Sequence, residues 1–271
     1  MTRPLRLTAI LAHPDDESLG FGGALAKYAA EGVEVSLITA TRGERGRYLG
    51  ERDGPTHPGP EKLAVLREAE LRAAAEALGI KDLTILGYLD GRLDQADPSE
   101  VVTRIAGHVR RLRPHVVVTF AQDGAYGHPD HVAICQFATA AVVAAASPAA
   151  KAEGEPHGVS KLYYLVGTLE SMTAYQSVFK KLTSFVDGVE REALGWPEWE
   201  ITTVIDTAEV WPTVWKAVSC HYSQIASYSR LKELPPEHHE ALWGRGQFYR
   251  VFSTVNGGRR RETDLFEGLR D

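Results

Sequence analysis

The sequence predicts an α/β protein with a Rossmann-like, mostly parallel sheet and helices on both of its faces. Short apolar runs at residues 5–12, 33–39, 83–86 and 116–120 alternate with segments of helical periodicity. The run at 116–120, which reads Val-Val-Val-Thr-Phe, is typical of a strand covered on both faces. Strands that alternate with helices favour a parallel sheet, and ligands then bind outside the carboxyl ends of the strands. We therefore expect the active site at that edge of the sheet.

Two helices in the first half of the chain have clear ends. Residues 22–31 form a predicted helix, and Gly32 ends it before the second strand begins. Residues 61–78 form a longer amphipathic helix, with leucines and alanines on one side and Gly79 at its C-terminal stop. The opening strand, helix and strand therefore predict a β-α-β unit.

The middle of the chain continues the alternation, and the pattern weakens after residue 160. Residues 99–112 are predicted to be helical, with Asp97 or Ser99 available as the N-cap. Residues 129–146 form a further predicted helix that begins with a proline, which the first turn tolerates. The remaining predicted elements are strands at 161–166, 201–205 and 247–252 and a helix at 210–218.

We expect a single domain over residues 1–271. A chain of 271 residues can bury one large α/β core, and no internal repeat or low-complexity block divides it. Residues 149–160 are polar and contain alanine, glycine and proline, which predicts a mobile connection. Residues 256–271 are expected to form an exposed tail.

Composition and charge indicate a soluble intracellular protein. Apolar residues make up 44% of the chain and charged residues 24%, and the net charge of −6 gives no reason to expect nucleic acid. The two cysteines, Cys135 and Cys220, offer neither a disulfide framework nor a Cys-x-x-Cys pair. The N-terminus lacks the features of a signal peptide, and the longest apolar stretch, 138–146, is too short to span a bilayer. We therefore expect a cytoplasmic protein without a membrane partner.

One histidine and three acids directly follow the first predicted strand, in the order His13-Pro14-Asp15-Asp16-Glu17. His13 and Asp16 are three positions apart on a loop tightened by the proline, so both can face one metal ion. Asp15 is expected to point elsewhere, which favours the role of general base, and Glu17 is expected to lie behind the ligands. The competing interpretation is that the acids only cap the helix that follows.

A second cluster, Gly127-His128-Pro129-Asp130-His131, lies beyond the strand at 116–120. Because the proline suits the first turn of a helix, His128 and His131 are expected to share one face. We expect His131 to be the third metal ligand, and His128 to stabilise the oxyanion or protonate the leaving amine. Asp130 would orient an imidazole. The competing interpretation is an exposed helix start with two solvated histidines.

Together the two clusters predict metal-assisted hydrolysis. Two imidazoles and one carboxylate hold a divalent metal, and a neighbouring carboxylate can take the proton of a bound water. The same ligands suit a non-haem iron oxygenase, although that enzyme needs no base beside them. A third interpretation is a non-catalytic Rossmann-like nucleotide-binding module. However, Leu25 stands where the Gly-x-Gly-x-x-Gly spacing that starts at Gly20 needs its third glycine.

Both clusters resemble the signature motifs of the zinc-dependent N-acetylglucosaminyl de-N-acetylases. This is the PIG-L or LmbE-like family, which includes deacetylases of mycothiol and bacillithiol biosynthesis. Three further segments resemble the family and extend the similarity to about residue 224. They are Thr41-Arg42-Gly43-Glu44-Arg45-Gly46, Arg67-Glu68-Ala69-Glu70 and His221-Tyr222-Ser223-Gln224.

The resemblance implies a metal set that agrees with the spacing argument. His13, Asp16 and His131 would bind Zn²⁺, and Fe²⁺ or another divalent metal would suit the same ligands. Asp15 would act as the base.

The resemblance also implies further roles around the metal. His128 would pair with Asp130, and Tyr126 would bring a phenol near the acetyl carbonyl. Arg67 and Asp90 would contact the sugar, but an exposed salt bridge on a helix and a turn aspartate are equally open interpretations of these two residues.

The implied reaction removes the acetyl group from an N-acetylglucosamine-type conjugate, and it releases acetate and a free amine. The expected partner is this small-molecule N-acetylated sugar conjugate. Family members are often oligomers, so a homo-oligomer is an open expectation. The sequence leaves the aglycone, the role of His221 and the role of the loop at residues 42–60 undecided.

Overall fold

A seven-stranded sheet forms the centre of the structure, a computed structural model that describes residues 4–52, 54–173, 183–186, 188–225, 231–258 and 260–270. The strand order is β3-β2-β1-β4-β5-β9-β8. The first five strands in this order are parallel, and β9 and β8 continue the sheet in antiparallel fashion. The strands are β1 (Arg6–Leu11), β2 (Glu34–Thr41), β3 (Asp82–Tyr88), β4 (Val116–Phe120), β5 (Lys161–Leu165), β8 (Thr203–Asp206) and β9 (Arg245–Ser253).

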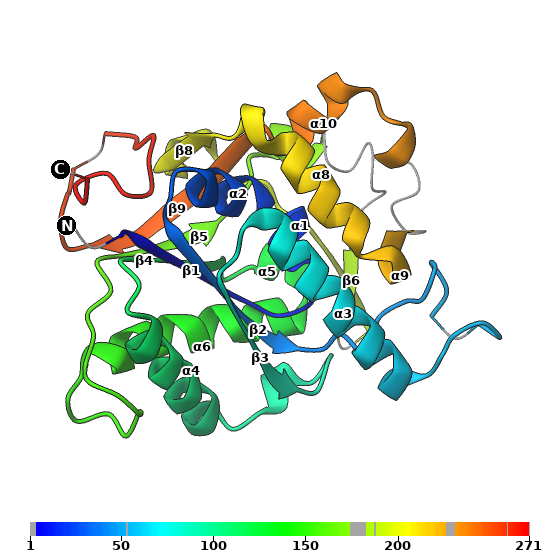
Figure 1. Cartoon of the computed structure of the whole chain (residues 1–271), viewed down its shortest axis with the longest axis horizontal. Coiled ribbons are helices and arrows are strands. Elements are labelled where there is room, and N and C mark those ends of the chain that lie inside the picture. The colour runs from blue at the N-terminus through cyan, green and yellow to red at the C-terminus, as the bar shows by residue number, and fades with distance from the viewer. Residues whose placement is uncertain are drawn as a thin grey trace.

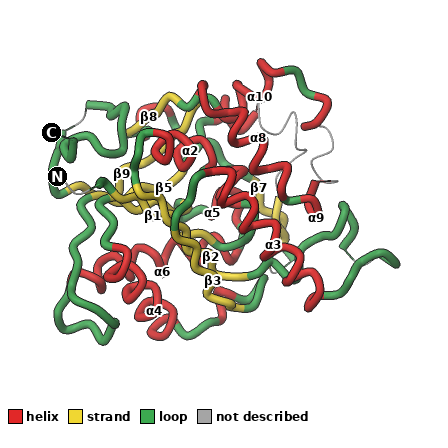
Figure 2. Tube along the Cα trace, in the orientation of Figure 1, coloured by secondary structure: helices red, strands yellow, loops and turns green. Residues whose placement is uncertain are grey.

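Helices cover both faces of the sheet (Figure 1). One layer contains α4 and α6, and α2, α3 and α8 lie on the opposite side. Short helices surround this frame, and a long loop between β2 and α3 extends away from it (Figure 2). The helices are α1 (Asp16–Leu19), α2 (Gly22–Ala30), α3 (Pro60–Leu78), α4 (Pro98–Leu112), α5 (Gly124–Gly127), α6 (Pro129–Ala146), α8 (Trp211–Cys220), α9 (Tyr222–Ile225) and α10 (Pro236–Trp243).

The predicted fold class is confirmed, and several elements agree closely with the prediction. The strand at 116–120 and the helix at 129–146 have the predicted bounds, and all five residues of β4 are buried. Asp97 is the N-cap of α4, because its side chain accepts a hydrogen bond from the Ser99 amide at 2.8 Å. The antiparallel end of the sheet was not specified by the sequence pattern.

Helix α6 has the length and apolar composition of a membrane span. In the fold it packs against α4 and the sheet, and 56% of it is buried. A core helix of a globular protein has the same composition.

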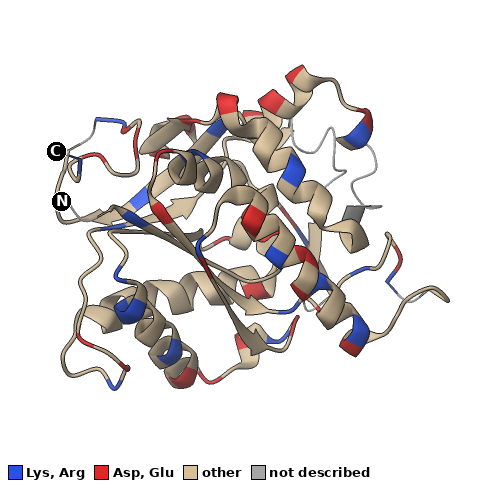
Figure 3. Cartoon of the chain, viewed as in Figure 1, with Lys and Arg blue, Asp and Glu red and all other residues tan. Residues whose placement is uncertain are grey.

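Positive and negative residues are intermixed along α3 (Figure 3).

A separate two-stranded hairpin was not anticipated. It consists of β6 (Thr183–Val186) and β7 (Val189–Glu192). All four residues of β7 are exposed, so the segment has no alternation of apolar and polar residues that could have identified it as a strand.

The expectation of an exposed tail at residues 256–271 is wrong for its central part, residues 262–266, while most of the described residues on either side of that part are exposed. Leu265 and Phe266 are fully buried against the main core, and Glu262 is 1% exposed. The Tyr28 hydroxyl donates to Asp264 and accepts from the Leu265 amide, which ties this segment to α2. Two apolar residues among many polar ones gave too weak a pattern to predict this packing.

The connection at residues 149–160 contains no helix or strand. The buried Arg110 side chain donates hydrogen bonds to carbonyl groups of Ala145, Ser147, Ala152 and Gly154. The bonds to Ala152 and Gly154 join the connection to α4, and its mobility stays a prediction.

The carboxyl ends of β1 and β4 lie side by side, because the two strands are neighbours in the sheet. The chain runs from β1 to β2 and β3 on one side, and later to β4 and β5 on the other. A crevice is expected where the strand order reverses in this way. Both histidine and acid clusters follow these two strands, so the fold brings them together at this position.

Candidate metal centre

Three predicted ligands converge at the carboxyl ends of β1 and β4. The His13 Nδ1 atom lies 3.2 Å from His131 Nε2. The Asp16 carboxylate lies 3.7 Å from His13 Nδ1 and 3.4 Å from His131 Nε2. All three side chains are at least nine-tenths buried. Two main-chain amides, those of Ala12 and His13, donate to Asp16 and fix its direction.

The spacing of these atoms fits a tetrahedral ion. Zinc binds imidazole nitrogen at about 2.0–2.1 Å, which places tetrahedral ligand atoms roughly 3.3 Å from one another. The separation of 3.2 Å between His13 Nδ1 and His131 Nε2 agrees with that value. Each imidazole also has one Asp16 oxygen nearby, Oδ2 at 3.7 Å from His13 Nδ1 and Oδ1 at 3.4 Å from His131 Nε2. The residues present therefore fit a divalent metal.

His128 offers a second possibility for the third ligand. Its nearest ring nitrogen lies within 4.8 Å of ligand atoms of His13 and His131. We assign the position to Asp16, because its carboxylate lies 3.7 Å from His13 Nδ1 and 3.4 Å from His131 Nε2 and offsets the charge of the ion.

His128 has the protonation needed to donate a hydrogen bond. Its Nδ1 accepts from the Asp130 amide at 3.2 Å as the N-cap of α6, which leaves the hydrogen on Nε2. Burial and the nearby His13 and His131 lower the pKa of His128 to about 3. A neutral imidazole with an Nε2 hydrogen suits oxyanion stabilisation better than proton donation to an amine.

Asp130 orients His13 and not His128, which corrects the predicted pairing. Its carboxylate lies 3.0 Å from His13 Nε2 and also accepts from the Gly91 and Leu93 amides. Asp90 lies 3.2 Å from the same nitrogen. Burial disfavours a charged His13, but the bonds to both carboxylates outweigh it and raise the pKa of His13 to about 10.

Asp90, predicted to contact the sugar, thus also contacts the metal ligand His13 and helps to orient its ring. It is 7% exposed and lines the cleft, and its second oxygen accepts from the Arg45 amide. The simple turn interpretation does not account for this contact with His13.

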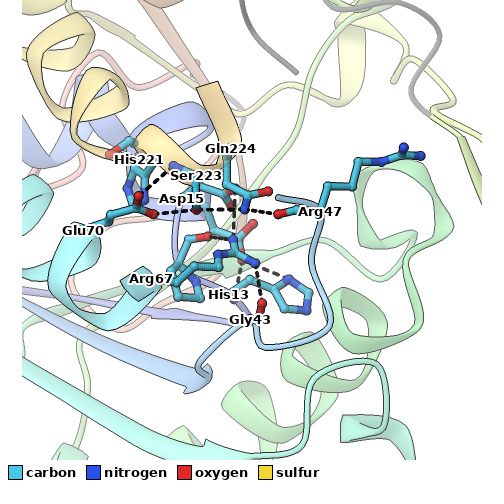
Figure 4. A network of polar contacts seen from close by, with 12 residues as sticks. His13, Asp15, Gly43, Arg47, Arg67, Glu70, His221, Ser223 and Gln224 are labelled. Atoms are coloured by element: carbon cyan, nitrogen blue, oxygen red, sulfur yellow. Dashed lines mark hydrogen bonds and ion pairs between the residues drawn. The ribbon is translucent and has the colours of Figure 1, made fainter. Parts of the chain in front are cut away.

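The Asp15 side chain does not cap the helix that follows it. It is the N-cap of α1, but its side chain makes no capping hydrogen bond. Its carboxylate instead lies 3.1 Å from the Arg67 guanidinium (Figure 4). Burial raises the pKa of Asp15, and Arg67 opposes this rise. A buried carboxylate with a raised pKa is suited to accept and return a proton.

Arg67 is buried and not the exposed salt bridge that the sequence left open. It is 4% exposed, and it donates to the carbonyl groups of Gly43 and Pro14 as well as to Asp15. Gly43 has φ +65°, and a Cβ atom there would lie 2.2 Å from the guanidinium. The glycine in the Thr41–Gly46 loop therefore makes room for Arg67.

Tyr126 lies next to the two histidines of α6. Its ring centroid is 5.9 Å from that of His128 and 5.4 Å from that of His131. The preceding Ala125 has φ +65°, a conformation that costs free energy for a residue with a Cβ atom. The Ser184 hydroxyl of the hairpin donates to the Tyr126 carbonyl at 2.9 Å.

Two buried residues near Asp15 were not among the predicted site residues. Glu17 accepts from the Asp15 amide and contacts His221, which the sequence left undecided. Beside it, Ser223 binds Glu70 and Gln224 binds the Arg47 carbonyl (Figure 4). The His-Tyr-Ser-Gln pattern was the sequence signal for this group, but these partners are more than 150 residues away.

A cleft of about 1520 Å³ opens above the predicted ligands. Arg45, Arg47 and Arg52 lie along it on the loop between β2 and α3. Phe185 and Leu194 also line the cleft, and both are exposed. The volume is large enough for a substrate with more than one ring.

The fold and this site define a class of protein. A buried two-histidine and one-carboxylate set, with a further carboxylate in the same cleft, is the arrangement of a metal-dependent hydrolase. Known proteins identify the family. The chain belongs to the PIG-L family of GlcNAc-PI de-N-acetylases, whose sequence profile matches residues 8–142.

A relative from Kineococcus radiotolerans supports this assignment along nearly the whole chain. It is named 1D-myo-inositol 2-acetamido-2-deoxy-alpha-D-glucopyranoside deacetylase and is 35% identical over 315 residues. The match covers 99% of this chain and 84% of the relative.

Solved structures share the fold. The conserved protein TT1542 from Thermus thermophilus is 27% identical, with a TM-score of 0.65 and coverage of 93% of this chain and 97% of that one. The 4-carboxy-2-hydroxymuconate hydratase GalB from Pseudomonas putida is 20% identical, with a TM-score of 0.70 and coverage of 94% and 99%. The hydratase shows that this fold alone does not specify deacetylation.

Proposed function

We propose that the protein is a zinc-dependent deacetylase that removes the acetyl group from an N-acetylglucosamine-type conjugate. The observation that carries this proposal is the buried Asp15 carboxylate, held by Arg67 in the cleft of the three ligands. An oxygenase with the same ligand set has no use for such a base. A nucleotide-binding module does not require the three metal-binding residues.

His13, Asp16 and His131 would hold the ion. When bound, zinc acts as a Lewis acid on the acetamide carbonyl and lowers the pKa of its water toward about 7. Zinc is preferred in this proposal because the ligand separations suit a tetrahedral site, although iron accepts the same donors.

The chain's own residues then move the proton and stabilise charge. Asp15 removes a proton as water attacks the carbonyl carbon, and the carbonyl oxygen becomes an oxyanion. The Nε2–H group of His128 donates a hydrogen bond to that oxygen. The Tyr126 side chain lies beside His128 and can donate a second hydrogen bond through its hydroxyl. Asp15 returns the proton to the amide nitrogen, the C–N bond breaks, and acetate and an amine leave.

The substrate class follows from the family and the cleft. The relative from Kineococcus radiotolerans is named as the deacetylase of an inositol 2-acetamido-2-deoxy-glucopyranoside, and a cleft of about 1520 Å³ accommodates a sugar with an aglycone. We propose that the protein acts as a cytoplasmic enzyme on a small-molecule conjugate. Both of its cysteines are free, which suits a reducing compartment.

The test measures free-amine release from N-acetylglucosamine and from its inositol and malate conjugates. Metal-loaded and chelated protein are compared, and bound metal is quantified by elemental analysis. We expect release only with metal present, and we expect it to be fastest on one conjugate. Stoichiometric metal binding without amine release from any of the three would contradict the proposed reaction.

A further inference from the structure

Asp15 has a main-chain conformation that needs external support. Its φ of 98° and ψ of −23° lie in the left-handed half of conformational space, which a residue with a Cβ atom adopts at a cost. Such strain persists only where surrounding contacts hold it. Because the direction of the Asp15 carboxylate depends on this backbone, whatever holds the backbone also positions the base.

Glu17 provides a direct contact to that backbone. Its Oε2 accepts a hydrogen bond from the Asp15 amide at 2.9 Å. Its Oε1 accepts from the Ser18 hydroxyl at 2.6 Å and lies 2.7 Å from His221 Nε2. Glu17 is fully buried, so none of these contacts is available to substrate.

His221 is the buried partner of the Glu17 carboxylate. It is 1% exposed, and although burial disfavours its charged form, Glu17 outweighs this and raises the pKa of His221. An unpaired buried carboxylate would be strongly destabilising. His221 therefore holds the Glu17 carboxylate in place, from a position 204 residues further along the chain.

The segment that carries His221 is itself fixed. The next residues bind through Ser223 to Glu70 of α3 and through Gln224 to the Arg47 carbonyl (Figure 4). The Leu49 amide also donates to the Ser223 carbonyl at 2.7 Å. The Glu17–His221 pair is therefore anchored to α3, to α8 and to the loop that lines the cleft.

We propose that Glu17 and His221 are positioning residues that hold the Asp15 backbone in its left-handed conformation and thereby aim the general base. This inference rests on the proposed function only in its kinetic consequence, a lower rate of deacetylation. Its structural consequence, the φ angle of Asp15, can be measured without any substrate.

The kinetic test compares Glu17→Ala, Glu17→Gln and His221→Gln with the wild type. We expect kcat to fall about 10- to 100-fold in Glu17→Ala and His221→Gln, the range typical of groups that orient a reacting residue. KM and the bound metal per chain should stay within about twofold, because neither residue touches substrate or ion. Glu17→Gln should retain more kcat than Glu17→Ala, since its amide oxygen can still accept from the Asp15 amide.

A double-mutant cycle separates positioning from general damage. In an Asp15→Asn background, adding Glu17→Ala should lower the residual rate by less than about twofold, because the base is already absent. His157→Gln is the matched histidine control, since it loses a bond to the Pro114 carbonyl at the opposite end of the sheet. Its kcat should stay within about twofold of the wild type.

A crystal structure of Glu17→Ala gives the independent result. We expect Asp15 to relax to negative φ while His13, Asp16 and His131 keep their arrangement, and His221→Gln provides the second structure if Glu17→Ala does not fold. An unchanged Asp15 φ, an unchanged kcat, or a loss of metal that parallels the loss of rate would overturn the positioning role. A wild type that releases no amine would overturn the proposed function instead and leave the crystallographic test standing.

Discussion

The Asp15 carboxylate lies between a cation and the metal ligands, and its neighbours decide how it ionises. Burial raises its pKa, and Arg67 at 3.1 Å keeps the charged form accessible. A base needs this balance, because it must release the proton again when the amine leaves. The sequence identified Asp15 for this role because its neighbours His13 and Asp16 were assigned to the ion and because the family resemblance implies the same base.

Replacing Asp15 with asparagine should separate metal binding from turnover. We expect Asp15→Asn to retain one metal per chain and to lower kcat by roughly 10²- to 10⁴-fold, because the amide cannot accept the proton. Amine release and elemental analysis on the same samples measure both effects. Asp94→Asn, at an exposed aspartate, is the control. A fully active Asp15→Asn enzyme would exclude the assigned base.

Asp130 shows where reasoning from sequence spacing fails at this scale. His128 is two positions away, yet only the Asp130 main chain bonds to it. The carboxylate turns toward His13 and toward the amides of Gly91 and Leu93, which are 39 and 37 residues distant in sequence. Local spacing cannot reveal a preference set by groups that only the fold brings near.

At the scale of elements, the C-terminal segment is joined to the sheet through one buried carboxylate. Glu262 accepts hydrogen bonds from Lys161 of β5, Thr203 of β8, and Tyr163 and Asn256. Burial alone would raise its pKa, but these bonds lower the pKa of Glu262 to about 2. The segment that the sequence assigned to an exposed tail thus closes the antiparallel end of the sheet.

Glu262→Gln should lower the free energy of unfolding by about 3 kcal/mol at neutral pH, because it breaks a buried ion pair. The folded pKa lies below the unfolded value of about 4.3, so the carboxylate stabilises the fold above that value. Its contribution is lost as the pH falls from about 4 to about 2. The difference between wild type and Glu262→Gln should therefore shrink over this interval in urea unfolding experiments.

Glu198→Gln provides the comparison for an exposed ion pair. The Glu198 side chain is 64% exposed and pairs with Arg261 at 2.6 Å. Its loss should change the stability by less than about 1 kcal/mol. A pH-independent difference for Glu262→Gln would argue against the depressed pKa of this residue.

At the scale of the whole molecule, metal should couple stability to activity. The ligands follow β1 and β4, so the ion binds the folded chain and not the unfolded one. Zinc at about 100 times its dissociation constant should add roughly 2.7 kcal/mol to the free energy of unfolding. Chelation should lower the midpoint of thermal unfolding and abolish amine release, and added zinc should restore both.

His131→Ala is the control for this experiment. Without the third ligand, the midpoint of thermal unfolding should respond little to zinc or to a chelator. An equal response of wild type and His131→Ala would place the bound zinc somewhere other than the predicted site.

The sequence by itself determined the fold class, most helices and strands, and the identity of the site. These features rest on local physics: apolar periodicity selects helix or strand, and short motifs after β1 and β4 carry the ligands. His13, Asp16 and His131 could be named because each motif lies next to a predicted strand end.

Only the tertiary structure decided how the ligands are supported and where the chain ends pack. Asp130, Glu17 and Glu262 have partners that lie 37 to 204 residues away, and a carboxylate is costly to bury without such hydrogen-bond partners. The paired strands β6 and β7 have no alternation of apolar and polar residues that would predict them. Pairing between distant polar groups depends on the complete fold, because no local pattern records which of them will be buried together.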